Sequence, residues 1–316
     1  MRPDRLPYAL PAPGEPTRVA FVGDPAAFGP HVLGAPAGGL IPTLVAPGDH
    51  DALRAADPHV VVALAPESFA PGALDAVAAP VLGVVAAPLQ GPEHDPHPVY
   101  AANLEALRVL APDSVDRVVL TDALSWESAA TLGLPLWRAM PLPVDDRLYR
   151  APRRTARPPR VVALGAATAH RDEVLDGLRR EFALSRHAGP PGAEDLRAAL
   201  DAADVALNVH AERWVMAFEP TLLVHLAAGH LVVTELLETL YGLEPGLDLL
   251  VVSDHYEMDL RVHQLFKTPE MYDRVRLRGH HKSRQFKASI IWPRVIGDLL
   301  ADLAAFGTDR QRPATA

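Results

Sequence analysis

Several short apolar segments of this sequence run into small, polar or charged residues of the kinds that bind anions. The segment "PRVVAL" leads directly into "GAATAHRDE", which begins at Gly165 and passes through Thr168. Small residues there would let backbone N–H groups point outward, and the first turn of a following helix favours an anion such as a diphosphate. His170 and Arg171 could add further donors. The alternative is an ordinary strand-to-helix turn with a solvated arginine, because neither GxGxxG nor the lysine of a P-loop is present.

A second group of polar residues follows the apolar segment "DVALNV". His210 comes first and Glu212 stands two residues later. A histidine at the carboxyl end of a strand could donate a hydrogen bond to a phosphate or to a sugar hydroxyl. It could equally be a structural group whose hydrogen bonds are satisfied within the protein. The residue types alone leave both interpretations open.

The stretch "FEPTLLVHLAAGHLVVTE" combines an acid, an apolar helix and a glycine. Pro220 suits the first turn of a helix, and Glu219 stands beside it at the positive end of the helix dipole. Gly229 predicts the left-handed residue that ends the helix before the strand "HLVVT", which Glu235 follows. Glu219 could accept hydrogen bonds from two hydroxyls of a ribose or hexose, or it could simply stabilise its own helix.

The segment "EHDPHP" places two histidines and an aspartate close together. His94, Asp95 and His97 could supply a base or hold an acceptor hydroxyl. No ligand pair in it has an established zinc spacing, so no metal is expected. The GxSxG and HExxH signatures of common hydrolases are also absent.

The composition of the chain excludes several classes of protein. Its 316 residues suffice for two domains, and 49% hydrophobic residues can form a large core. A formal net charge of −9 argues against general binding to nucleic acid. There are no cysteines, which excludes disulfides and thiol catalysis. No secretory signal and no apolar run of about 18 to 20 residues is present, so a cytoplasmic protein without a transmembrane segment is expected.

The pattern of strands and helices predicts two similar α/β domains. "TRVAFVG" and "PRVVALG" are apolar strands of similar length closed by glycine, and each begins a series of valine-rich strands alternating with helices. This alternation predicts two Rossmann-like, doubly wound parallel-sheet domains, at 1–150 and 151–316. The proline-rich 134–159 is expected to be a linker, and helices over 270–287 and 290–305 are expected to close the second domain. Ligands bind at the carboxyl ends of such strands.

The residues of 160–306 resemble a known family. "DVALNVHAERWVMAFEPTLLVHLAAGHLVVTE", with the later "FKASIIWPRVIGDLLADL", resembles the C-terminal domain of GT-B-fold glycosyltransferases, closest to the bacterial set that includes the spore-coat-type domains. The resemblance is weaker over 17–150, where it includes "ANLEAL" and "LPLPVDDRLY". It implies that the C-terminal domain holds a nucleotide-diphosphate sugar and the N-terminal domain an acceptor, with no bound metal and no cofactor. The donor would contact the Gly165 loop, the strand end at 210–212, and the helix between Glu219 and Gly229.

One departure from this family concerns its acids. Many relatives carry two acids spaced E-x7-E, the second five residues before the helix-closing glycine. Here Met216 and Val224 occupy those positions, and Glu219 fills neither. Either Glu219 replaces these acids in contacting the sugar-nucleotide donor, or the donor is bound weakly.

The function that these residues predict is transfer of a sugar from a nucleotide-diphosphate sugar to an acceptor hydroxyl. If the reaction inverts the configuration at the anomeric carbon, a base is required to take the proton of the acceptor hydroxyl. His97 or Asp95 is the candidate for this base. The alternatives are a non-catalytic sugar-nucleotide-binding protein, a GT-B-fold sugar-nucleotide epimerase, and a two-domain small-ligand binding protein of the periplasmic kind. The last of these normally needs an export signal. The donor, the acceptor and the stereochemical outcome do not follow from the sequence.

Overall fold

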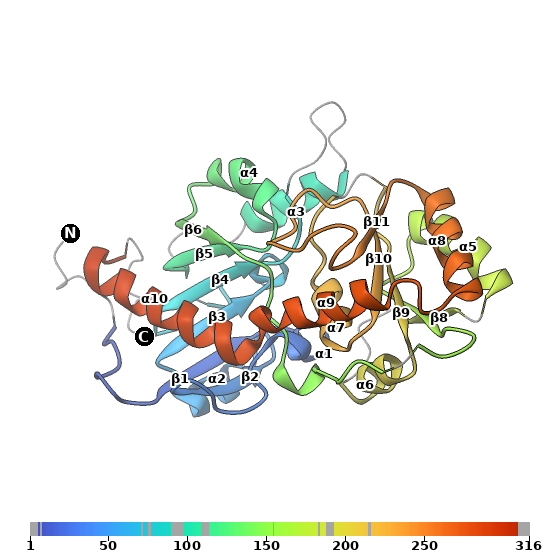
Figure 1. Cartoon of the computed structure of the whole chain (residues 1–316). Coiled ribbons are helices and arrows are strands. Elements are labelled where there is room, and N and C mark those ends of the chain that lie inside the picture. Colours follow the sequence, from blue (N-terminus) through green and yellow to red (C-terminus); the bar gives the residue numbers. More distant parts are fainter. Residues whose placement is uncertain are drawn as a thin grey trace. The chain divides into compact units, whose positions relative to one another are not determined.

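The protein consists of two compact units. The computed structural model describes residues 6, 8–70, 72–74, 77–89, 98–108, 114–153, 155–182, 184–187, 193–213 and 216–308. One unit comprises 1–142 together with 288–316, and the other comprises 143–287. Each unit contains a parallel sheet with helices (Figure 1). Within the described part of the chain, no helix is long and apolar enough to cross a membrane.

The first unit is built on a six-stranded parallel sheet with the order β2-β1-β3-β4-β5-β6. Its strands are β1 (Thr17–Val22), β2 (Leu40–Val45), β3 (Val60–Leu64), β4 (Val81–Val85), β5 (Arg117–Leu120) and β6 (Leu136–Ala139). Its helices are α1 (Pro25–Phe28), α2 (His50–Ala56), α3 (Pro98–Arg108), α4 (Trp126–Ala130) and α10 (Ala288–Phe306).

Alternate residues of these strands enter two different cores, as the period of a strand requires. Val19 and Phe21 of β1 face one core, which Trp292 and the rest of the apolar face of α10 complete. Ala20 and Val22 face the opposite core with residues of α3 and α4. The sheet is therefore buried on both faces, which explains why β3 and β4 consist of continuous apolar residues.

The second unit is built on a five-stranded parallel sheet with the order β11-β10-β9-β7-β8. Its strands are β7 (Val161–Leu164), β8 (Leu184–His187), β9 (Val205–Asn208), β10 (Leu231–Glu235) and β11 (Leu250–Val252). Its helices are α5 (Ala169–Glu181), α6 (Ala193–Asp201), α7 (Pro220–Ala227), α8 (His255–Lys267) and α9 (Asp273–Ser283).

The order of strands in the second unit reverses at β7. From β7 the chain forms β8 on one side and then crosses over to β9 on the other side. In open α/β sheets, ligands bind beyond the carboxyl ends of the strands at such a reversal. The loops after β7 and β9 begin at Gly165 and Val209, so the reversal lies where two of the sequence motifs were found.

The predicted α/β class and the two parallel sheets are confirmed, but the structure divides the chain differently. Val144 and Leu148 pack in the core of the second unit, so the change of unit falls at 142/143 instead of 150/151. The predicted helix at 290–305 exists as α10, but its buried face packs on the first sheet. The prediction that the terminal helices all close the second domain was therefore wrong for this helix.

The proline-rich stretch 134–159 is not only a linker. Leu136–Ala139 forms the edge strand β6, paired with β5, and an edge position tolerates the neighbouring prolines. The sequence also missed β2, "LIPTLV", at the opposite edge. Its proline and its partly exposed residues hide the pattern of a buried strand.

Candidate functional site

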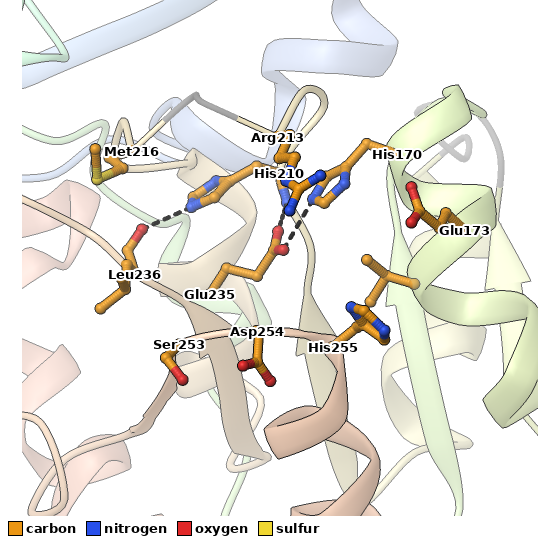
Figure 2. A pocket seen from close by; sticks show the side chains of 11 residues that line it. His170, Glu173, His210, Arg213, Met216, Glu235, Leu236, Ser253, Asp254 and His255 are labelled. Atoms are coloured by element: carbon orange, nitrogen blue, oxygen red, sulfur yellow. Dashed lines mark hydrogen bonds and ion pairs between the residues drawn. The ribbon is translucent and has the colours of Figure 1, made fainter. Parts of the chain in front are cut away.

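A pocket of about 250 Å³ lies at the carboxyl ends of the strands of the second unit (Figure 2). His170 and Glu173 of α5 line it, as do His210 and Arg213 after β9. Glu235, which ends β10, and Ser253, Asp254 and His255 after β11 complete its polar lining. The strand-end rule therefore points to this pocket, and residues from four segments converge there.

Glu235 joins two of these segments. Its Oε1 lies 2.8 Å from Nε2 of His170, and its Oε2 accepts a hydrogen bond of 2.7 Å from the backbone N–H of His210. Figure 2 shows the carboxylate between the two histidines. The side chains of His170 and Glu235 are 11% and 14% exposed, so this contact is largely shielded from water.

Two helices begin at the pocket. Thr168 caps α5 by accepting a hydrogen bond from the N–H of Arg171, and Asp254 caps α8 by accepting one from Glu257. His170 lies in the first turn of α5, and His255 is the first residue of α8. The positive ends of two helix dipoles therefore border the same space, which favours an anion there.

Arg171 does not line this pocket. Its guanidinium is buried and donates to the carbonyl oxygens of Val209 and Ala166 and to both carboxylate oxygens of Glu219. The arginine thus ties together the loops after β7 and β9. The sequence predicted that Arg171 and Glu219 bind the sugar-nucleotide donor. In the structure they bind each other, and neither lines the pocket.

Gly165 provides the room that this arginine occupies. Its φ is +127°, and a Cβ placed on it would lie 2.7 Å from Cζ of Arg171. Any larger residue would therefore displace the guanidinium and strain the backbone. The glycine after β7 is required by packing against Arg171.

His210 lines the pocket but is only 2% exposed. Its Nε2 contacts the carbonyl oxygen of Leu236 at 2.8 Å, so Nε2 carries a proton. Its Nδ1 lies 3.5 Å from Oε1 of Glu219, within ion-pair range but without the geometry of a hydrogen bond. Burial disfavours a charged imidazole, but Glu219, the Leu236 carbonyl and Glu235 outweigh it and raise the pKa of His210.

The other two residues that were predicted to contact the sugar-nucleotide donor, Glu212 and Gly229, lie outside the pocket. Glu212 is half-buried and does not line the pocket. Gly229 ends α7 as predicted: its φ is +81°, its N–H donates to Leu226, and the N–H of His230 donates to His225. These two hydrogen bonds define a Schellman motif.

The structure also shows where the two residues lie that stand in place of the family's acids. Val224 is 2% exposed and belongs to the apolar core, whereas Met216 lines the pocket. His97 and Asp95 lie outside the described residues and remain predictions. Within the described ranges, no cluster of histidine, aspartate and glutamate could hold a metal ion.

Sequence reasoning missed Glu173, Arg213, Asp254 and His255 as pocket residues. The last two follow β11 directly, so the rule that selected His210 and Glu235 could have selected them as well. Glu173 could have been found one helical turn after His170. Nothing in the sequence around Arg213 distinguishes it from an ordinary surface arginine.

Comparison with known proteins supports the fold. Neither a protein-family model nor a curated protein matches the sequence. Among solved structures, HepE of Anabaena in complex with UDP and glucose matches with a TM-score of 0.56 at 13% identity, over 91% of this chain and 100% of that one. Sucrose-phosphate synthase from Thermosynechococcus elongatus matches with a TM-score of 0.57 at 10% identity, over 92% and 99%. AviGT4, a glycosyltransferase involved in avilamycin A biosynthesis, matches with a TM-score of 0.54 at 15% identity, over 92% and 98%.

These matches cover both units of the chain and almost the whole of each matched protein. At such low identity they establish the architecture, and the two parallel sheets agree with it. The chain has the two-unit α/β fold of the GT-B glycosyltransferases.

Proposed function

We propose that this protein is a glycosyltransferase that uses a nucleotide-diphosphate sugar, and that the pocket of the second unit holds the diphosphate part of this donor. The observation that carries the proposal is the convergence of two helix N-termini, His170 and Arg213 at the carboxyl ends of the strands. Each of these features favours a bound anion. The GT-B fold, shared with HepE, which was crystallised with UDP and glucose and with UDP-glucose, supports the same assignment.

The chemistry that follows is a displacement at the anomeric carbon of the donor sugar. An acceptor hydroxyl forms the new bond to this carbon, the bond to the diphosphate oxygen breaks, and the nucleoside diphosphate leaves with the electron pair. The first turns of α5 and α8, together with charged imidazoles, would stabilise the charge that develops on the leaving group. If the reaction inverts, Asp95 or His97 is the proposed base for the acceptor proton.

A panel of ligands tests this proposal. Purified protein is heated with UDP, GDP, ADP, TDP and the corresponding glucose esters, and unfolding is followed by fluorescence. A ligand present at 100 times its dissociation constant adds about 2.7 kcal/mol of stability, which raises the midpoint measurably. His170→Ala and Arg213→Ala are expected to reduce the shift. Arg180→Ala, a substitution near the end of the same helix as His170 and away from the pocket, is the matched control. No shift with any nucleotide would contradict the proposal.

Turnover distinguishes the transferase from a second candidate, a non-catalytic sugar-nucleotide-binding protein. Met216 and Val224 at the two acid positions favour this second candidate, because neither side chain can bind a sugar hydroxyl. The two are separated by measuring release of nucleoside diphosphate from the ester that shifts the melting temperature, with a mixture of sugar and lipid alcohols as acceptors. Release that depends on the acceptor supports the transferase, and binding without release supports the second candidate.

A further inference from the structure

Glu235 is a pocket residue whose position suggests a specific task. Its two oxygens are divided between the side chain of His170 and the backbone N–H of His210, so it links the start of α5 to the end of β9. A carboxylate that lines an anion site would normally oppose binding. Its presence there needs a physical reason.

The contact with Glu235 fixes the proton on one nitrogen of His170. A carboxylate only accepts, so Nε2 of His170 must carry the hydrogen that lies between them. Within the described part of the chain, Nδ1 of His170 makes no hydrogen bond. Neutral His170 therefore presents a lone pair at Nδ1, and only the protonated ring presents a second N–H donor.

The charges around the pocket make this distinction important. Three carboxylates line it, those of Glu173, Glu235 and Asp254. Among the described lining residues, Arg213 supplies the one guanidinium. Arg171 is nearby but is neutralised by Glu219 at 3.0 Å. With neutral histidines the lining therefore carries more negative than positive charge. An incoming diphosphate meets a favourable lining only when imidazoles are charged.

The groups that face these imidazoles come from four elements. His170 faces Glu235 of β10 directly, and Glu173 of its own helix and Asp254 and His255 of α8 share its pocket. His210 faces Glu219 at the start of α7, which in turn holds Arg171. The carboxylates of Glu219 and Glu235 raise the pKa of His210 despite its burial.

We infer that Glu235 is a positioning residue that holds His170 by Nε2, so that an anion is bound through Nδ1–H and nucleotide binding is coupled to uptake of a proton. The inference rests on the proposed function. It assigns to Glu235 the orientation of His170, and it predicts that the affinity for a diphosphate falls as the pH rises.

Calorimetric titration tests the coupling. UDP and inorganic pyrophosphate are titrated into the full chain at several pH values between 6 and 8.5, in buffers of different ionisation enthalpy, which gives the number of protons taken up. The expected result is net uptake, with affinity falling by up to about tenfold per pH unit where one proton is coupled. Binding of either anion without uptake across this range would overturn the inference and leave the proposed function standing. Absence of binding by both anions at every pH would overturn the two together.

Two substitutions test the role of Glu235 itself. Glu235→Gln keeps an oxygen for the backbone N–H of His210 and turns its amide N–H toward Nε2 of His170. Neutral His170 then carries its hydrogen on Nδ1, so nucleotide binding should lose its proton uptake and depend less on pH. His170→Asn leaves Glu235 on the backbone of His210 and should reduce proton uptake. Glu238→Gln, an exposed neighbour outside the pocket, is the control and should bind as the unaltered protein does. An unchanged pH profile in Glu235→Gln would overturn the inference.

Discussion

Arg171 and Glu219 form a buried ion pair, with Nη2 of the arginine 3.0 Å from Oε2 of the glutamate. Their side chains are only 8% and 18% exposed. The pair connects the first turn of α5 to the start of α7, and His210 stands beside it. Two residues whose types suggested donor binding therefore form the support behind the pocket.

Breaking this pair should destabilise the protein strongly. Arg171→Ala leaves the Glu219 carboxylate without its main partner, and the loss of one member of a buried pair costs about 3–5 kcal/mol. The free energy of unfolding in urea measures it. Arg54→Ala removes an arginine from the exposed pair with Asp51 and should cost less than about 1 kcal/mol. A loss as small as this in Arg171→Ala would show that the pair does not stabilise the unit.

Gly165→Ala should destabilise through the same guanidinium. The added Cβ meets Cζ of Arg171 at 2.7 Å, and the φ of +127° strains any side chain, so a loss of about 1–3 kcal/mol is expected. Part of this loss should disappear in the Arg171→Ala background, because the clash is then absent. A double-mutant cycle on the unfolding free energy measures the coupling. Strict additivity of the two substitutions would refute the contact.

The buried histidines His225 and His230 should make the protein sensitive to acid. Nε2 of His230 donates to the Leu200 carbonyl, so its Nδ1 accepts a hydrogen bond from Nδ1–H of His225, 3.2 Å away. This arrangement requires His230 to be neutral, because its Nδ1 must keep a lone pair. Burial lowers the pKa of His225 well below its usual value, and it lowers the pKa of His230 to about 4.

The sign of the pH effect follows from these shifts. Between about pH 6.5 and pH 4 the unfolded chain binds more protons at these sites than the folded protein does, so stability falls with falling pH. His230 alone contributes a loss of about 3 kcal/mol over this range. His230→Gln keeps a donor and an acceptor without titrating, and its stability should depend less on pH. His281→Gln, on the exposed side of α9, should retain the full dependence. Parallel pH profiles for both variants, measured by urea unfolding, would contradict this explanation.

Trp292 should contribute strongly to the first unit. It is fully buried, contacts Phe21 with 5.0 Å between ring centroids, and donates from Nε1 to the carbonyl of His31. Trp292→Ala should cost about 3–5 kcal/mol in the unfolding of the unit that contains β1 to β6. Ile290→Ala changes an exposed residue of the same helix and should cost far less. Hydrogen exchange of β1 reports this loss, and unaltered protection there would count against the packing of α10 on the first sheet.

The sequence predicted the buried strands well and the partners of individual side chains poorly. Continuous valine-rich segments such as β3 and β4 can hardly form anything but strands buried on both faces. The edge strands β2 and β6 escaped because each has a proline within it or directly before it. An amphipathic pattern in α10 predicts a buried face, but it does not say which sheet the face will cover.

The same limit applies to the candidate site. Counting strand ends located His170, His210 and Glu235, because parallel strands bring their carboxyl ends to one edge. Arg171 and Glu219 lie 48 positions apart, and no local pattern shows that they meet. The choice between a residue that binds a ligand and one that supports it depends on such contacts.

The central claim is that the pocket at the carboxyl ends of β7, β9, β10 and β11 holds a nucleoside diphosphate. Hydrogen–deuterium exchange of the full chain, with and without the nucleotide that gives the largest thermal shift, tests it most directly. The account predicts slower exchange in peptides that cover 165–173, 209–213 and 253–257. Protection confined to peptides of the first unit, with these three segments unchanged, would contradict it.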